Sequence, residues 1–229
     1  MVSAIIVAAG KGTRMGPNVD KLFLEVAGRP VVAHTWQRFA TAKCIDEIIL
    51  VVRDGMQSTF EDLAKTFQLQ KPYKLVSGGA ERQDSVWNGL QAVSDDSEFV
   101  AIHDGARPCA SPALIESTVE MARECGAAVA AQPVTDTVKE SAGGKVIDRT
   151  LDRSRLWAVQ TPQAFHVDII RHALEEVRKR GLHVTDDTAA CELINQPVQL
   201  VSSALPNPKV TRPEDLAFVG LLLKEHRNL

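Results

Sequence analysis

Short apolar runs alternate along the chain with longer segments in which apolar residues recur every three or four positions. The apolar runs, which are typical of buried strands, lie at residues 4–9, 47–52, 73–76, 99–104, 127–134 and 198–201. Helical spacing is found at residues 30–40, 83–93, 111–125 and 168–180. This alternation predicts an α/β fold, in which helices cover both faces of a mostly parallel twisted sheet.

Residues at the expected helix ends agree with this pattern. Ser111 followed by Pro112 is typical of an N-cap and a first helical turn. Thr211 and Glu214 fit a capping box at the start of a last helix. Because no repeat, low-complexity tract or linker interrupts the chain, we predict a single domain over residues 1–229.

The segment at about residues 134–154 breaks the alternation of strands and helices. Two polar runs with strand-like alternation flank the turn residues "SAGG", which predicts a β-hairpin. Large apolar residues are too few there for a central element, and an isolated hairpin is only marginally stable in water. The hairpin therefore either folds back on the edge of its own sheet or projects as an arm that contacts a second subunit.

Composition narrows the class of protein. The chain has 229 residues, is 45% hydrophobic and carries a formal net charge of −3, so its overall charge gives no reason to bind nucleic acid or a membrane. The apolar runs are too short to span a bilayer, and the first of them leads into a glycine loop instead of a cleavage site. Four cysteines without metal-site spacing are expected to be reduced. We expect a cytoplasmic enzyme.

A glycine loop, "AAGKGTRMGPNVDK", follows the first apolar run. It matches neither the P-loop pattern nor the dinucleotide-binding pattern, because Met15 stands where each requires glycine. A strand, a glycine turn and two cations, Arg14 and Lys21, are still features that suit a phosphate site. The alternative is an ordinary strand-to-helix turn with solvated charges.

Further candidates for ligand binding follow other predicted strands. Asp104 and Arg107 come directly after the run at 99–104, where ligands of open α/β sheets bind. Asp104 could hold Mg²⁺ or ligand hydroxyls, or simply cap its loop, and Arg107 could hold a phosphate. Ser85, close after two glycines, suits a base or a ribose, although a capped turn explains it equally well. Lys209 on its own is best explained as a solvated side chain, and only its occurrence together with the other motifs makes it a candidate for ligand binding.

Together these motifs carry a family resemblance across nearly the whole chain. In order, they are "AAGKGTRM" with Lys21, "SGGAERQDSV", "HDGARP", "PVTDTVK", "LWAVQTPQAF", "TDD" and "KVTRPEDL". The chain resembles the 2-C-methyl-D-erythritol 4-phosphate cytidylyltransferase family of the non-mevalonate isoprenoid pathway. The resemblance implies a Rossmann-like nucleotidyltransferase fold, with CTP, a polyol phosphate and Mg²⁺ as reactants and cofactor.

The resemblance also implies roles for individual residues. Arg14, Lys21 and Lys209 would be catalytic, holding the phosphates and the charge that develops on them. The CTP site would comprise Ala8, Ala9, Gly10, Gly12, Gly79, Ser85 and Asp104, with Asp104 also the candidate for a metal held largely through CTP phosphates. The second substrate would meet Arg107, Thr137, Arg153 and Thr161. The hairpin would be a homodimer arm that presents Thr137 and Arg153 to the neighbouring site.

One motif departs from the family pattern, and three alternative functions remain. The run "SALPNPKV" has Pro206 and Pro208 before Lys209, and lacks the acidic residue that many relatives have there. A close relative transfers CMP to ribitol 5-phosphate with nearly the same motifs. A catalytically silent nucleotide-binding module would not require three cations, and a nicotinamide oxidoreductase conflicts with the failed dinucleotide pattern.

Overall fold

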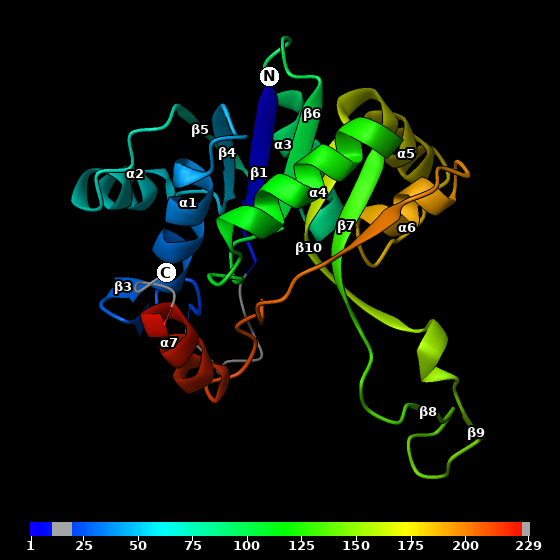
Figure 1. Cartoon of the computed structure of the whole chain (residues 1–229). Helices are drawn as coiled ribbons and strands as arrows, with labels where there is room; N and C mark the ends of the chain where they lie inside the picture. Colours follow the sequence, from blue (N-terminus) through cyan, green and yellow to red (C-terminus); the bar gives the residue numbers. More distant parts are fainter. Residues whose placement is uncertain (11–19, 226–229) are drawn as a thin grey trace.

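A seven-stranded sheet forms the centre of the molecule (Figure 1). The structure, a computed structural model, describes residues 1–10 and 20–225. The strands of this sheet are β1 (Val2–Ala8), β4 (Glu47–Val52), β5 (Tyr73–Ser77), β6 (Phe99–Asp104), β7 (Ala127–Pro133), β10 (Trp157–His166) and β11 (Gln199–Ser202). Their order across the sheet is β11, β7, β10, β6, β1, β4, β5.

The sheet is parallel except for one strand. β1 pairs in parallel with β4 and β6, β4 with β5, and β7 with β11, as the sequence predicts. β10 runs antiparallel to both of its neighbours, β6 and β7, and its register with β7 shifts between Val159 and Gln163. This strand was not among the predicted ones, because polar residues and Pro162 interrupt its apolar positions.

Helices cover both faces of the sheet. They are α1 (Val31–Thr41), α2 (Gln57–Thr66), α3 (Arg82–Gln91), α4 (Pro112–Cys125), α5 (Val167–Lys179), α6 (Asp187–Glu192) and α7 (Asp215–Glu225). α1, α2 and α4 pack on one face, where Trp36, Phe60 and Ile115 are buried, and α3, α5 and α6 pack on the other. The four helices predicted from spacing are confirmed, whereas α2 and α6 were not predicted.

Of the two helix starts predicted from sequence, one is confirmed by the structure and the other is shifted. The Ser111 hydroxyl accepts a hydrogen bond from the backbone N–H of Leu114 at 3.1 Å, which confirms the predicted N-cap of α4. The capping box predicted at the last helix is wrong in position. α7 begins at Asp215, and the Asp215 carboxylate accepts from the backbone N–H groups of Thr211 and Arg212, at 2.7 and 2.8 Å. Glu214 precedes the helix, so the acidic residue one position later takes the expected role.

The predicted hairpin forms and projects away from the sheet (Figure 1). Its two short strands, β8 (Lys139–Glu140) and β9 (Arg149–Thr150), pair only as a separate two-stranded sheet, and a 3-10 helix at Arg153–Arg155 leads back to β10. Val146 and Ile147 on the arm are 74% and 61% exposed. The structure thus favours a projecting arm over a hairpin folded back on its own sheet.

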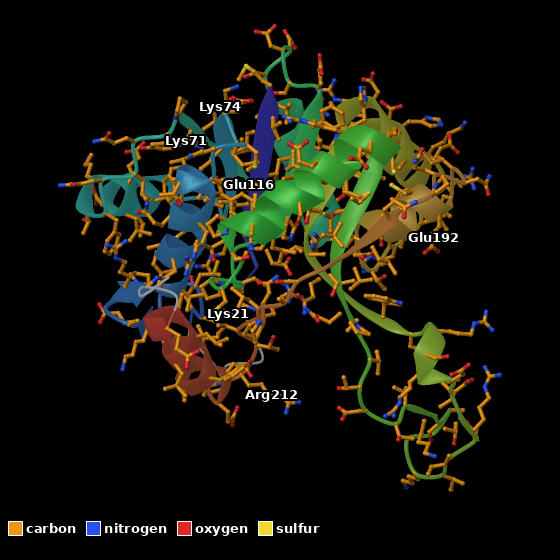
Figure 2. All side chains as sticks on the ribbon, viewed as in Figure 1. Lys21, Lys71, Lys74, Glu116, Glu192 and Arg212 are labelled. Atoms are coloured by element: carbon orange, nitrogen blue, oxygen red, sulfur yellow. The ribbon has the colours of Figure 1, made fainter. Side chains whose placement is uncertain are left out.

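The remaining elements surround the carboxyl ends of the central strands. β2 (Glu25–Val26) and β3 (Arg29–Pro30) form a small ribbon, and α7 buries Val219 and Leu223 in a cluster with Val26. Figure 2 shows Lys21 at the end of the molecule toward which β1 runs, and Lys74 toward the other end. No helix among the described residues is long and apolar enough to cross a membrane.

Candidate active site

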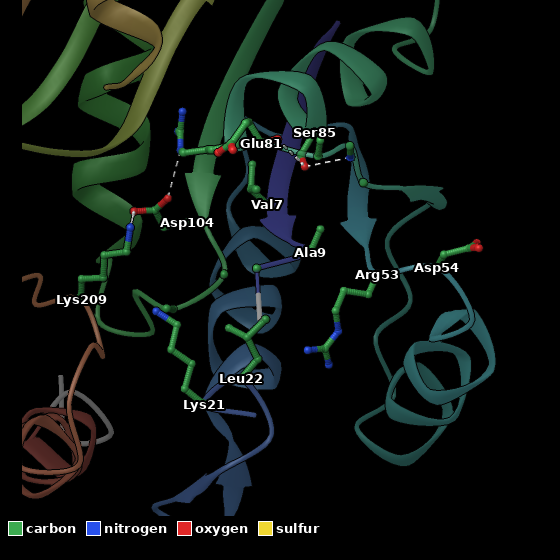
Figure 3. Close-up of a pocket in the computed structure, with 17 residues that line it drawn as sticks. Val7, Ala9, Lys21, Leu22, Arg53, Asp54, Glu81, Ser85, Asp104 and Lys209 are labelled. Carbon is green, nitrogen blue, oxygen red and sulfur yellow. Dashed lines mark hydrogen bonds and ion pairs between the residues drawn. The ribbon is translucent and has the colours of Figure 1, made fainter. Parts of the chain in front are cut away.

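A pocket of about 940 Å³ opens where β1, β4, β5 and β6 end. Its walls come from residues that directly follow these strands, together with Lys21, the start of α3 and Lys209 (Figure 3). Ligands of open α/β sheets bind at the carboxyl ends of the strands, because the loops there diverge and leave a crevice. The fold therefore places the candidate residues at the edge where binding is expected.

Two glycines allow backbone segments to approach closely in this pocket. The backbone N–H of Gly78 donates to the carbonyl of Val52 at 2.8 Å, which extends the pairing beyond β5. A Cβ on Gly78 would lie 2.3 Å from the Cβ of Ala9, and one on Gly79 would lie 2.3 Å from the Cβ of Asp84. Any larger residue would thus force these segments apart, so the two glycines keep an exposed strip of backbone along this wall of the pocket.

Ser85 holds that backbone strip in place. It lies in the first turns of α3 and is 3% exposed. Its hydroxyl accepts from the backbone N–H of Gly79 and donates to the carbonyl of Glu81, both at 3.1 Å. Glu81 and Asp84 form a reciprocal capping box at the same helix end. The proton of the Ser85 hydroxyl is therefore engaged, and one lone pair remains available.

Asp104 is the electrostatic centre of the pocket. Its Oδ2 lies 2.8 Å from Lys209 Nζ (Figure 3). The same oxygen lies 3.4 Å from Arg107 Nε, and Oδ1 lies 3.5 Å from Arg82 Nε. Burial alone would raise the pKa of Asp104, but Lys209, Arg82 and Arg107 outweigh burial and lower the pKa well below its usual range. Asp104 is thus ionised at neutral pH and holds a cluster of cations together.

Arg82, which sequence reasoning missed, is fixed from outside the pocket by α6. Its guanidinium binds the carboxylate of Asp187 with two hydrogen bonds, of 3.0 and 2.8 Å. Burial tends to lower the pKa of Arg82, but Asp187 raises it above its ordinary value. The neighbouring Asp186 caps α6 and accepts from Gln163 at 2.9 Å. Arg82 lies in the motif "SGGAERQDSV" and Asp187 in the motif "TDD", but nothing in the sequence indicates that the two side chains form an ion pair.

Thr161 orders the other side of Asp104. The backbone N–H of Asp104 donates to the Thr161 hydroxyl at 3.1 Å, and that hydroxyl lies 3.0 Å from His103 Nδ1. His103 Nε2 lies 3.1 Å from the carbonyl of Arg107, which can only accept, so Nε2 carries the proton and Nδ1 accepts from Thr161. Burial lowers the pKa of His103 to about 4. Asn207 completes the network by donating from its amide to the carbonyl of Thr161 at 2.7 Å.

Both lysines predicted from sequence point into the pocket (Figure 3). Lys21 is 9% exposed, and its Nζ donates to the carbonyl of Val210 at 3.0 Å. The backbone N–H of Val210 donates in turn to the carbonyl of Ala106 at 2.8 Å. The first loop, the loop after β6 and the segment carrying Lys209 are thereby joined, so that two ammonium groups from distant parts of the chain face one cavity.

Comparison with known proteins agrees with this geometry. A model of the 2-C-methyl-D-erythritol 4-phosphate cytidylyltransferase family matches residues 2–225. The chain belongs to this family. It is 42% identical over 226 residues to the 2-C-methyl-D-erythritol 4-phosphate cytidylyltransferase of Alkaliphilus oremlandii, covering 98% of this chain and 96% of the relative. It is 44% identical over 226 residues to that of Dehalococcoides mccartyi strain 195, covering 99% and 97%.

Solved structures of this family share the fold. The 4-diphosphocytidyl-2C-methyl-D-erythritol synthase of Anaerococcus prevotii superposes with a TM-score of 0.85 at 34% identity, covering 97% of this chain and 98% of that one. The 2-C-methyl-D-erythritol 4-phosphate cytidylyltransferase of Thermus thermophilus gives a TM-score of 0.80 at 30% identity, covering 98% and 100%. The predicted Rossmann-like nucleotidyltransferase fold is thereby confirmed.

The structure brings most residues expected from the family pattern to one place. Ala9, Gly10, Gly79, Ser85, Lys21, Lys209 and Asp104 all line the pocket. Ala8 is buried in the core at the end of β1, and Arg107 contacts Asp104 and donates to the carbonyl of Asn207 at 2.8 Å. Thr161 contacts the backbone of Asp104, which fits an ordering role. Arg14 and Gly12 lie outside the described residues.

Two predicted residues lie on the arm. Thr137 and Arg153 are exposed, and the Arg153 guanidinium donates to the carbonyl of Thr135 within the arm. The arm extends away from the sheet whose strands end at the pocket (Figure 1). A role for Thr137 and Arg153 in substrate binding would therefore suit a neighbouring subunit, and it stays a prediction.

The described residues do not form a metal site from protein ligands alone. Among them, no group of three or more His, Cys, Asp or Glu side chains could hold a metal ion. Asp104 is a pocket carboxylate, but its two oxygens already face three cationic side chains. Mg²⁺ usually keeps several waters and binds substrate phosphates with one or two carboxylates. Asp104 therefore fits at most as a single ligand beside the phosphates of a nucleotide.

Proposed function

We propose that this protein transfers CMP from CTP to 2-C-methyl-D-erythritol 4-phosphate and releases pyrophosphate. Family membership supports the reaction, and the convergence of Lys21 and Lys209 on a pocket with an ionised Asp104 is the observation that carries it. A phosphate oxygen of the polyol attacks the α-phosphorus of CTP, the bond to the β-phosphate breaks, and pyrophosphate carries away the electron pair. This displacement requires no protein nucleophile, so catalysis is mainly positioning and charge stabilisation.

Each lysine has the donors that this role requires. An ammonium group has three N–H donors. Asp104 engages one donor of Lys209, and the carbonyl of Val210 engages one of Lys21. The other donors of Lys209 can meet phosphate oxygens without disturbing its contact with Asp104, and the ammonium group of Lys21 faces the same pocket. We assign to Arg14, which precedes Lys21 in the same sequence motif, a further contact to the triphosphate. Mg²⁺, when bound with CTP, would neutralise phosphate charge beside Asp104.

Ser85 gives a physical reason for the choice of base. Its proton is donated to the carbonyl of Glu81, so toward a ligand the hydroxyl can only accept. Cytosine presents an amino group at the position where uracil presents a carbonyl oxygen. A base edge facing Ser85 is therefore satisfied by CTP and left unpaired by UTP, which predicts a clear preference for CTP.

A direct assay tests the proposal. Purified protein with Mg²⁺, CTP and 2-C-methyl-D-erythritol 4-phosphate should release pyrophosphate and form the cytidine diphosphate derivative of the polyol. Parallel reactions replace the polyol with ribitol 5-phosphate, or CTP with UTP. Equal turnover of ribitol 5-phosphate would favour the related activity, and CTP binding without any pyrophosphate release would favour a silent nucleotide-binding module.

We also propose that the arm forms a homodimer in which Arg153 serves the neighbouring site. The exposed Val146 and Ile147, and the separation of the arm from its own sheet, support this. Mixing Lys21→Ala and Arg153→Ala proteins, each inactive alone, would then place both defects in one site of a mixed dimer and leave the other intact. Random exchange should restore about a quarter of wild-type activity, since half of the dimers are mixed. Confirmed exchange without recovery would refute the shared site.

The free state of all four cysteines fits the expected cytoplasmic location, where thiols are kept reduced.

A further inference from the structure

Arg53 lies on the side of the pocket away from Lys209 (Figure 3). It directly follows β4 and extends toward the middle of the pocket, although neither its position in the sequence nor the proposed reaction gives it a role. Its guanidinium forms an ion pair with the carboxylate of Asp20, the residue immediately before Lys21. The two side chains are 26% and 21% exposed, so this pair is partly withdrawn from solvent and less screened than a surface pair.

Asp20 organises the turn that carries Lys21. While Oδ2 of Asp20 meets Arg53, Oδ1 accepts from the backbone N–H of Leu22 at 3.1 Å. The backbone carbonyl of Asp20 accepts from the N–H of Phe23 at 3.0 Å. Asp20 thus closes a tight turn through its side chain and its main chain, and Arg53 attaches that turn to the end of β4.

The other end of the turn is also fixed. Leu22 is 3% exposed in the core, and its carbonyl accepts from the N–H of Val32, at the start of α1, at 3.0 Å. The Lys21 side chain reaches from between these two anchors to the carbonyl of Val210. Because lysine is long and flexible, the place of its ammonium group depends on how firmly its backbone is held.

We propose that Arg53 is a positioning residue for Lys21, acting through Asp20. The ion pair fixes the backbone from which Lys21 reaches the reacting phosphates. This inference rests on the proposed nucleotidyl transfer and adds to it a residue that does not itself take part in the chemistry. A direct contact between Arg53 and the nucleotide is the competing explanation.

Steady-state kinetics separate the two explanations. Four variants are compared: Arg53→Met, Arg53→Lys, Asp20→Asn and the double variant Arg53→Met with Asp20→Asn. The positioning role predicts that kcat falls about tenfold in Arg53→Met and in Asp20→Asn, because small misplacements of a catalytic group cost this much or more. KM for CTP should change less than kcat, Arg53→Lys should retain most activity, and the double variant should be no worse than the worse single one.

Arg123→Met provides a matched control. Arg123 pairs with Glu120 at 2.9 Å on α4, so this variant loses an arginine and an ion pair away from the pocket, and it should keep wild-type kinetics. Wild-type kcat in Arg53→Met would overturn the proposal. So would a raised KM in Arg53→Met with no effect of Asp20→Asn, since that pattern indicates a direct nucleotide contact.

Acylation of Lys21 in the substrate-free protein, followed by mass spectrometry, gives a readout independent of activity. A purely electrostatic effect on the Lys21 amine would act in opposite directions in the two variants: loss of the positive charge of Arg53 should slow acylation, and loss of the negative charge of Asp20 should speed it. Displacement of Lys21 instead predicts several-fold faster acylation in both variants. Opposite directions would refute the positioning role. If the wild-type protein proved inactive with CTP, this measurement would still test the pair, so the two failures are distinguishable.

Discussion

Lowering the pH should destabilise the protein through His103. The imidazole is completely buried, packs against Phe39 with ring centroids 4.7 Å apart, and uses both nitrogens in the network around Asp104. Burial lowers the pKa of His103 to about 4 from its ordinary value of 6.5. Protonation would remove the acceptor for the Thr161 hydroxyl and place a charge inside the core.

The size and direction of the effect follow from these two pKa values. Between pH 6.5 and pH 4 the unfolded chain binds a proton at His103 that the folded chain does not, so stability is fully present above pH 6.5 and is lost as the pH falls toward 4. The loss in the free energy of unfolding should be about 1.4 kcal/mol at pH 5.5 and about 2.5 kcal/mol at pH 4.5, relative to pH 7.5. Asp104, whose pKa is lowered from 3.8, adds its loss at still lower pH.

Urea denaturation at pH 7.5, 5.5 and 4.5 measures this loss. His103→Gln cannot titrate, so its free energy of unfolding should vary less with pH than that of the wild type by about the amounts above, whatever its absolute stability. Should the variant fail to fold, an NMR titration of the His103 ring in the wild type gives the folded pKa directly. Parallel pH profiles of wild type and variant, or a ring that titrates near 6.5, would refute the reasoning.

Other predictions concern the pocket itself. Lys21→Ala and Lys209→Ala should each lower kcat/KM about 10²-fold or more in a pyrophosphate-release assay, because each removes a charged donor from the reacting phosphates. The thermal unfolding temperature should change little, and near-normal turnover would contradict the proposed roles. Gly78→Ala should weaken CTP binding about tenfold by calorimetry, since its Cβ would meet that of Ala9, whereas Gly143→Ala on the arm, with no atom within 4 Å of the new Cβ, should not. Chelation with EDTA should abolish turnover and added Mg²⁺ should restore it; activity that survives exhaustive chelation would exclude a required metal.

Local patterns in the sequence predicted much of the fold. β4 and β6 are continuous apolar runs because both faces of their sheet are covered, and α4 carries its cap and its apolar spacing within its own residues. β10 was not predicted because polar residues and Pro162 interrupt its apolar positions, so neither a continuous apolar run nor a regular alternation is visible. α6 has only six residues, too few to show helical periodicity.

The candidate site was predictable where chemistry coincides with the end of a strand. Asp104, Ser85 and Lys21 follow strands or glycine turns, so their place could be inferred without tertiary contacts. Arg82 and Asp187 lie 105 positions apart in sequence, and only the packing of α3 and α6 against α5 brings them together. Arg53 was likewise missed, because a single arginine after a strand carries no motif and its partner Asp20 lies on another loop.

The antiparallel strand β10 connects the arm with the site. β7 carries the chain out to the arm and β10 brings it back, beginning at Trp157 and reaching Thr161 where it contacts the backbone of Asp104. If β10 ran parallel to β7, a long crossover connection would have to separate the two strands. Thr161 would then not lie on the strand that leads directly out of the arm. The Thr161 hydroxyl accepts from the backbone N–H of Asp104 and donates to Nδ1 of His103, so two hydrogen bonds connect the inner part of β10 to residues beside the pocket. The fold thus joins the surface expected to contact a second subunit to the carboxylate that holds the cations of the pocket.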